Sequence, residues 1–249
     1  MRRAFIVLCL GVFVVPPTFA QDASARIKAA QYALGMIRGP QRIDAINTIE
    51  YWGIGVNYTY HVSLSYLTPA MRVDIGRFTP TFRQIEVVNN NFAWDETIPG
   101  GGFIPGTTAT PKPAAVKERL LQLWTTPHGA LKAAARAGAN AKLSAENGDN
   151  VITFPLSGQL AGITMKVTLN AKDEVEKVET VNGNAVTITT YSDYKDLGEI
   201  KSDVRFPLHM VQAEKDGRRV FDLTISKTDM NNPYVVFPVP DNVEKSQRD

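Results

Sequence analysis

One stretch of strict alternation constrains this chain more than any other feature. From position 52 to position 66 every second residue is apolar, and the residues between them are small or polar. The apolar set consists of Trp52, Ile54, Val56, Tyr58, Tyr60, Val62, Leu64 and Tyr66. A period of two is the pattern of a β-strand with one buried face. The stretch therefore predicts a sheet with a continuous apolar side.

The length of this stretch also predicts the shape of the sheet. At ~3.3 Å per residue, a single strand over 52–66 would extend for roughly 50 Å, far beyond the usual five or six residues. Gly53 and Gly55 are the positions at which such a strand can bend. We therefore expect one long strand that bends at these glycines and a sheet that curves around its apolar face.

More strands are predicted at short intervals along the chain. They cover 71–77, 82–89, 151–156, 162–170, 174–181, 185–194, 204–213 and 219–228. Turn sequences such as Asn182-Gly183 and Asp216-Gly217 join several of them, and short turns of this kind connect antiparallel neighbours. The predicted fold class is α+β: a long, curved antiparallel sheet, open like a half-barrel, with one face exposed to water.

Helices are predicted to cover the other face. Apolar residues recur at helical spacing over 24–34, and Pro40 is expected to open a short second helix that reaches Ile46. A Gly-, Pro- and Thr-rich loop at 97–113, free to control entry to the sheet, precedes a helical insert at about 111–138. This insert is expected to form a lid on the concave apolar face.

The first twenty residues have the composition of a secretory signal peptide. Arg2 and Arg3 precede an apolar run over 4–15, and Thr18-Phe19-Ala20 places small residues before a cleavage site after Ala20. The run is too short to span a bilayer as a helix, which needs ~20 residues. We therefore expect a periplasmic or secreted protein without an integral membrane span, with residues 21–249 forming a single β-rich domain.

Charge and composition exclude several classes of function. The full chain has a formal charge of +2, and both excess positive charges, Arg2 and Arg3, lie in the predicted signal peptide. The remaining neutral chain lacks the basic face of a nucleic-acid-binding protein. Its three histidines, His61, His128 and His209, have no metal-ligand spacing, and nucleotide-binding and nucleophile motifs are absent. The sequence thus predicts no enzyme, no cofactor and no metal site.

Aromatic and apolar residues are the remaining candidates for a binding site. A curved sheet that is covered by only a few short helices favours an apolar cavity between the two. The candidate ligand-binding residues are Trp52, Ile54, Val56, Tyr58, Tyr60, Trp124, His128 and Met165. Plain core packing is the alternative role for the aromatic residues, and a structural role is the alternative for His128.

Three motifs give the chain a family resemblance. The segment 191–198, followed by Phe206-Pro207, is similar to a Tyr-x-Asp-Tyr-Lys/Arg…Gly…Phe-Pro pattern of the LolA-like lipoprotein carriers. The segment 221–225, with Val239-Pro240 after it, resembles the closing strand of that family. The segment 123–134 resembles the amino-terminal domain of some exported metallo-β-lactamase-fold hydrolases. No His-x-His-x-Asp-His stretch of the hydrolase module itself is found.

This resemblance implies a periplasmic half-barrel, and the apolar stripe together with the absence of catalytic motifs predicts that it binds a lipid, an acyl chain or another hydrophobic molecule without catalysing a reaction. A second function stays open, namely an accessory domain that works with a separate metallo-β-lactamase-fold hydrolase or another protein of the cell envelope. Such a domain would use the edge of its sheet or the region around His128 for docking.

Overall fold

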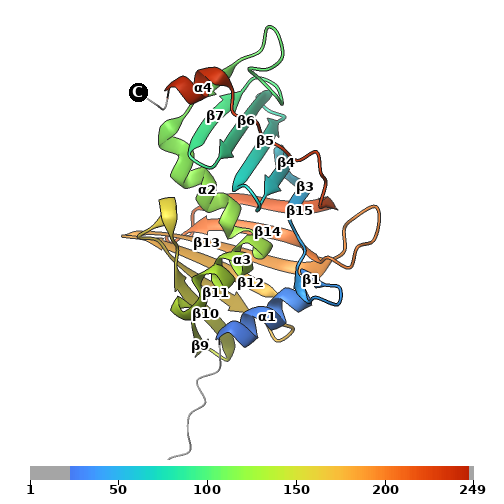
Figure 1. Ribbon diagram of the computed structural model, residues 1–249, viewed down its shortest axis with the longest axis vertical. Coiled ribbons are helices and arrows are strands. Elements are labelled where there is room, and N and C mark those ends of the chain that lie inside the picture. The colour runs from blue at the N-terminus through green and yellow to red at the C-terminus, as the bar shows by residue number, and fades with distance from the viewer. Residues whose placement is uncertain (1–22, 247–249) are drawn as a thin grey trace, which may run out of the picture.

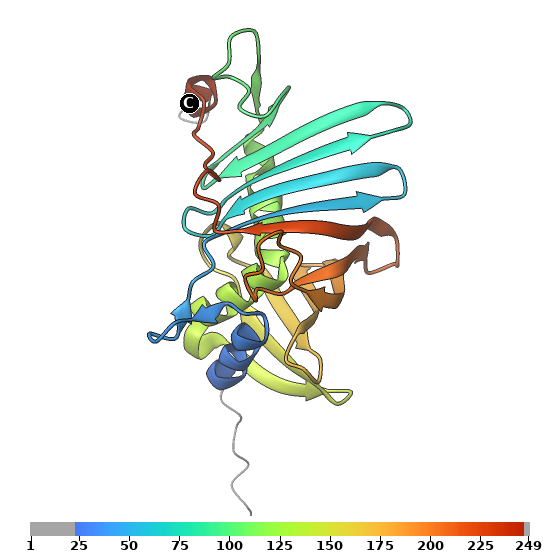
Figure 2. The same cartoon turned by 90° about the vertical axis from the view of Figure 1, so that its right-hand side faces the viewer.

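The computed structural model describes residues 23–246, and the predicted signal peptide lies outside them. Helix α1 (Ala23–Ala33) is followed by a two-stranded ladder of β1 (Ile37–Arg38) and β2 (Ile43–Asp44). All other strands of the described chain belong to one antiparallel sheet of 13 strands. The described chain thus consists mainly of one antiparallel sheet with a few short helices, in agreement with the predicted α+β half-barrel (Figures 1 and 2).

Two meanders make up the large sheet. The first contains β3 (Thr48–Gly55), β4 (Tyr58–Ser65), β5 (Ala70–Arg77), β6 (Phe82–Asn89), β7 (Phe92–Glu96) and β8 (Ala109–Pro111). The second contains β9 (Lys142–Glu146), β10 (Asp149–Pro155), β11 (Thr164–Leu169), β12 (Val175–Asn182), β13 (Ala185–Lys195), β14 (Phe206–Glu214) and β15 (Arg219–Met230). The pairing of β3 with β15 joins the meanders, so β8 and β9 are the edge strands.

The segment between the two edge strands crosses one face of the sheet, which we call the inner face. It contains a 3-10 turn (Pro113–Ala115), helix α2 (Val116–Thr125), helix α3 (Pro127–Ala137) and a second 3-10 turn (Gly138–Asn140). Helix α2 lies against β5 to β7, and α3 lies against β10 to β12 (Figure 1). The predicted helical insert is therefore present and covers the inner face.

The predicted long strand over 52–66 is wrong, because the chain turns back within it. Strand β3 ends at Gly55 and β4 begins at Tyr58, so Val56 and Asn57 form a two-residue hairpin turn. In this hairpin Tyr51 pairs with Val62, and Trp52 pairs with His61. Directly paired residues share a face, so the even-numbered apolar residues of β3 and those of β4 lie on opposite faces of the sheet.

The main hydrophobic core lies between the inner face and helices α1, α2 and α3. Val62, Leu64 and Tyr66 from the alternating stretch are buried there with Leu123 and Leu131 of the helices. Side chains fill most of this space, and the hollow lined by Tyr51, Thr126 and Tyr191, directly between the sheet and the α2–α3 junction, has a volume of about 10 Å³. The concave face is thus packed at its centre rather than empty.

A second, smaller core covers the outer face of the first meander. Trp94 and Ile85 contact Val235 and Phe237 of the C-terminal segment and Val243 of helix α4 (Asp241–Ser246). The expectation that one face is exposed to water therefore fails around Ile85, Val87 and Trp94, where the outer face of the sheet is covered as well. Figure 1 shows α4 beside this end of the sheet.

Two other predictions need correction. The helix expected from Pro40 to Ile46 is a turn followed by β2. Residues 97–113, expected to be irregular, contain the edge strand β8. In both places the tertiary pairing of short strands prevails over the local signals of proline and glycine. The other eight predicted strands and the helix over 24–34 correspond to elements of the structure within a few residues.

Candidate functional site

The α2–α3 junction is held against the sheet by hydroxyl groups. The side chain of Thr126 caps α3 by accepting a hydrogen bond from the backbone N–H of Gly129 at 3.2 Å. The same Thr126 hydroxyl lies 2.7 Å from the hydroxyl of Tyr66, directly after β4, and the hydroxyl of Tyr191 in β13 donates to the carbonyl of Thr125. Burial raises the pKa of both tyrosines, so they stay protonated. The junction is therefore fixed to both meanders.

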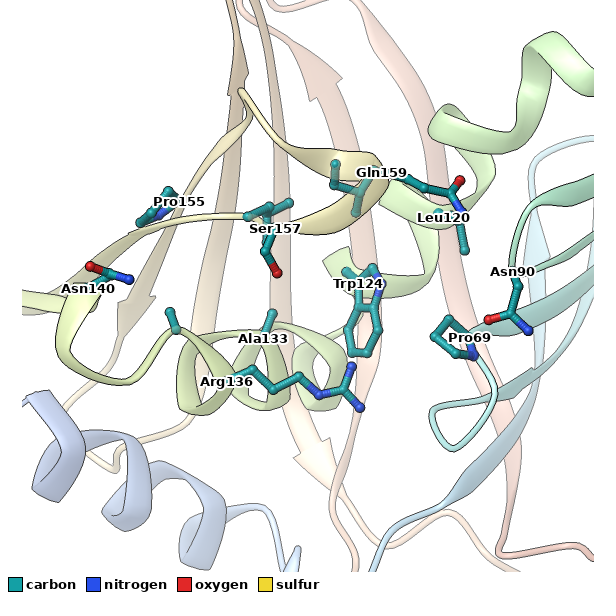
Figure 3. A pocket seen from close by; sticks show the side chains of 13 residues that line it. Pro69, Asn90, Leu120, Trp124, Ala133, Arg136, Asn140, Pro155, Ser157 and Gln159 are labelled. Carbon is teal, nitrogen blue, oxygen red and sulfur yellow. The ribbon is translucent and has the colours of Figure 1, made fainter.

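A pocket of about 330 Å³ lies on one side of this junction, and we call it the α3 pocket. Figure 3 shows side chains from both helices and from the segments that follow β4, β6, β10 and α3 converging on it. Its lining residues are Pro69, Asn90, Leu120, Trp124, Ala133, Arg136, Ala137, Asn140, Pro155, Leu156, Ser157, Gln159 and Leu160. The volume is at the lower end of the ~300–1,000 Å³ that is usual for small-molecule sites.

The α3 pocket has an apolar interior and a polar rim. Leu120, Trp124, Leu156 and Leu160 are otherwise buried in the core and present the rest of their surface to the pocket. Amide and hydroxyl side chains surround this interior, and the guanidinium of Arg136 lies 4.5 Å from the centre of the Trp124 ring. The arrangement suits a molecule with an apolar body and a polar end.

A second hollow of about 300 Å³, the α2 pocket, lies on the inner face on the other side of helix α2. Tyr60, Phe221 and Leu121 provide apolar surface, with the Tyr60 and Phe221 ring centres 6.2 Å apart. Two carboxylates, Glu86 and Glu118, also line it. Its chemistry therefore differs from that of the α3 pocket, where no carboxylate is among the lining residues.

The structure distributes the predicted ligand-binding residues over several places. Trp124 lines the α3 pocket, and Tyr60 lines the α2 pocket. Tyr58 lies on the inner face beside Tyr60, with ring centres 5.8 Å apart. Neither pocket is lined by any residue of the 97–113 loop, which we expected to control entry.

Two predicted residues, His128 and Met165, are fully buried in the main core. His128 lies parallel to the ring of Phe206 with centres 5.7 Å apart, and neither of its ring nitrogens has a well-formed hydrogen bond. Burial, and secondarily the ammonium of Lys132, lowers the pKa of His128 to about 3. The imidazole is therefore neutral, and it offers no surface for the docking role that we considered.

Three other predicted residues, Trp52, Ile54 and Val56, do not face the helices. Val56 is in the hairpin turn with 99% of its surface exposed, and Ile54 is 54% exposed. Trp52 stacks on His61 on the outer face, with ring centres 4.4 Å apart. The two-residue turn is the cause, because it exchanges the faces that odd and even positions occupy.

The outer face holds a polar cluster next to Trp52. Oε1 of Glu50 accepts a hydrogen bond from Ser63 at 2.7 Å and lies 3.2 Å from Nε2 of His61. The bond to His61, followed by those of Ser63 and Asn232, lowers the pKa of Glu50 to about 2. Ser63 and Glu50 meet the same imidazole nitrogen, whereas a catalytic Ser-His-acid relay uses both nitrogens. No metal-binding group of three or more His, Cys, Asp or Glu is found within residues 23–246.

Sequence reasoning missed most of the α3 pocket. Its lining includes the turns at Pro69 and Asn90 and the segment 155–160, which are far apart in the sequence. Trp124 is the one predicted ligand-binding residue that lines it, and the signal at Arg136 is limited to its helical spacing from Lys132 on α3. Only the topology, which brings the ends of β4, β6 and β10 to α3, shows that these residues meet.

No family model and no curated protein matches the chain. Among solved structures, an outer membrane lipoprotein-sorting protein domain from Vibrio parahaemolyticus is similar at 12% identity with a TM-score of 0.45, covering 91% of this chain and 99% of that one. A DUF1329 family protein from Desulfovibrio piger is similar at 5% identity with a TM-score of 0.48, covering 84% and 93%.

A third similarity is to the MucA/MucB complex of Pseudomonas aeruginosa, at 11% identity with a TM-score of 0.24, covering 89% of this chain and 60% of that one. The first structure belongs to the family that the sequence motifs resemble. Within the described residues, no helix is both long enough and apolar enough to cross a membrane.

Proposed function

We propose that this protein is a non-enzymatic binding protein for a lipid, an acyl chain or another hydrophobic molecule. Residues 1–20 would export it to the periplasm or the medium, and residues 21–249 would act as one β-rich domain. The observation that carries the proposal is the α3 pocket, with its apolar interior and polar rim. Trp124 provides the largest aromatic surface in this pocket.

The energy of such binding would come from burial of the apolar part of the ligand. Each Å² of apolar surface removed from water contributes about 25 cal/mol. Ordering of the ligand and loss of its translational freedom offset a large part of this gain. A pocket of about 330 Å³ suits one acyl chain rather than several. We therefore expect the ligand to bind with moderate affinity and to exchange reversibly.

Native mass spectrometry of the exported protein, followed by lipid extraction, tests the proposal directly. The expected result is a bound small molecule that is absent from Ala133→Phe, in which the new ring fills the pocket. Ala135→Phe is the matched control, because Ala135 is exposed on the same helix and does not line the pocket. Loss of the ligand from both variants, or its absence from the native protein, would contradict the proposal.

A second candidate function, an interaction domain for an envelope protein, is favoured by exposed apolar residues at the hairpin turns. Val56, Phe78, Phe82 and Val220 are each at least 49% exposed. The pairing of β6, β5, β4, β3, β15 and β14 places their turns at the same end of the sheet, and Figure 2 shows these turns on one side of the molecule.

Photo-crosslinking in the native bacterium tests this second function. A crosslinking residue at Phe78 should give a discrete protein adduct if the turns bind a partner, and mass spectrometry would show whether that partner is a metal-dependent hydrolase. The control position is Lys117, which is exposed on helix α2. An adduct pattern that is identical at both positions would argue against docking through the turns.

A further inference from the structure

Arg136 is the one charged side chain among the residues that line the α3 pocket. Its guanidinium lies over the face of Trp124 at 4.5 Å from the ring centre, and its Nη2 donates to the backbone carbonyl of Tyr66 at 3.3 Å. A guanidinium has five N–H donors. Stacking on an aromatic ring fixes its plane, and donors that Tyr66 does not use remain for a ligand.

The surroundings of Arg136 favour an anion. None of the ion pairs found within residues 23–246 involves Arg136. The neighbouring cation, Lys132, lies one helical turn earlier and forms an ion pair with Asp44 at 2.5 Å. Asp44 therefore compensates the charge of Lys132, and no ion pair found within residues 23–246 compensates the charge of Arg136 at the rim of the pocket.

The two pockets of the inner face thus differ in charge. Glu86 and Glu118 line the α2 pocket, and they would repel a carboxylate or a phosphate. The α3 pocket has Arg136 together with the neutral donors Asn90, Asn140 and Gln159. Planar guanidinium groups bind carboxylate and phosphate oxygens through paired hydrogen bonds.

We propose that the α3 pocket takes a single-chain amphiphile with an anionic head group, and that Arg136 binds this head group while the chain lies against Leu120, Trp124 and Leu160. The proposal rests on the proposed function and specifies its ligand class. A carboxylate and a phosphate monoester share the required chemistry, namely two or more anionic oxygens on one acyl chain. The bond to Arg136 sets the orientation of the ligand, with its head at the rim.

Three probes separate the contribution of the head-group charge to the binding affinity from the contribution of the acyl chain. The delipidated protein is titrated, below the micellar concentration of each probe, with palmitic acid, methyl palmitate and palmitoyl lysophosphatidic acid. The emission of Trp124 reports occupancy of this pocket, and Trp124→Phe identifies its share of the signal. Hydrogen bonds to charged groups contribute about 1.5–3 kcal/mol, which corresponds to a preference of roughly tenfold to hundredfold for an anionic probe over the ester.

Arg136→Gln should reduce this preference to about onefold, because the affinities for the two anionic probes fall to that for methyl palmitate in the same variant. Arg136→Lys should retain part of the preference because it keeps the charge. The matched control is Lys117→Gln, which removes one positive charge from an exposed site outside both pockets. A preference for only one of the two anionic probes supports the proposal and identifies the head group.

Equal affinity of the native protein for methyl palmitate and for both anionic probes would overturn the inference and leave the proposed function intact. An anion preference that persists in Arg136→Gln would also overturn it. Failure of all three probes to change the emission of Trp124 would reject the proposed function together with the inference. Circular dichroism of each variant confirms that a loss of binding is not a loss of folding.

Discussion

The hydroxyl of Tyr58 in β4 binds the backbone of Asp222 in β15, although strand β3 lies between the two. It accepts a hydrogen bond from the Asp222 N–H at 2.9 Å and lies 3.2 Å from the Asp222 carbonyl oxygen. The phenol ring crosses β3 directly above Gly55, where a Cβ atom would lie 2.3 Å from the ring. Glycine at position 55 therefore allows the two meanders to be connected by a side chain as well as by the β-ladder.

We expect Gly55→Ala to destabilise the protein by about 1–3 kcal/mol, since the ring of Tyr58 must move and lose its bonds to Asp222. In a Tyr58→Ala background the same substitution should cost much less, because no ring lies above the site. A double-mutant cycle from urea unfolding measures this coupling. If the effects of the two substitutions on the free energy of unfolding are additive, the contact between Gly55 and the Tyr58 ring does not contribute to stability.

Gly35→Ala should cost several kcal/mol. Gly35 has φ +70°, and its Cβ would lie 2.1 Å from the backbone carbonyl oxygen of Asp203, which cannot move independently of the chain. Gly39→Ala is the matched control, since Gly39 has φ +66° and nothing within 4 Å of the new atom. The control should show only the cost of left-handed backbone, about 1 kcal/mol. Thermal unfolding of both variants checks the difference, and equal costs would argue against close packing at Gly35.

Arg119 on α2 is expected to be essential for holding the helix to the first meander. Its guanidinium donates to the carbonyl oxygens of Val87 and Trp94 and to Asp95 at 2.6 Å, and the residue is 6% exposed. Arg119→Met should cost about 3–5 kcal/mol, because it leaves two carbonyl groups without this donor and removes the closer of the two cations that pair with Asp95. Lys117→Met, exposed on the same helix, should have little effect in urea unfolding. Similar midpoints for both variants would refute this role.

The stability of the protein should fall with acid through His128. Its pKa is about 3 when folded, against about 6.5 in an unfolded chain. The unfolded state therefore binds the proton first, and stability decreases as pH falls from about 6.5 towards 3, by about 1.4 kcal/mol per pH unit. His128→Phe keeps the stacking on Phe206 and should flatten this slope between pH 6.5 and 5, a range above that in which Glu50 titrates. Parallel pH profiles of the two proteins would contradict the prediction.

The strand pattern could be predicted from sequence because apolar alternation and turn dipeptides are local signals. The hairpin at Val56 and Asn57 could not, because this turn preserves the alternation of hydrophobicity across it while it reverses the chain. Trp52 and Tyr60 therefore have the same parity in the sequence and lie on opposite faces of the sheet. Pairing register, rather than periodicity, decides which face a residue occupies.

The candidate site was less predictable for a related reason. Trp124 was recognised because an aromatic residue on an amphipathic helix has a strong signal of its own. Asn90, Pro155 and Gln159 have no such signal, since their role depends on strand ends that meet only in the folded sheet. The opposite holds for His128, which was predicted as a ligand-binding residue because imidazole is a reactive group. The fold buries this side chain completely.

The connection between the two edge strands limits how far the sheet can flatten. With ~4.8 Å between neighbouring strands, a flat sheet of 13 strands would separate β8 from β9 by about 58 Å. The segment that links these strands would reach about 54 Å even if its helices, its 3-10 turns and the remaining residues Lys112, Thr126 and Ala141 were all collinear, and the extended backbone of Thr126 interrupts the helices. The helical form of this link thus keeps it shorter than a flat sheet would need, so we expect the strands to keep their curvature while a ligand binds and leaves.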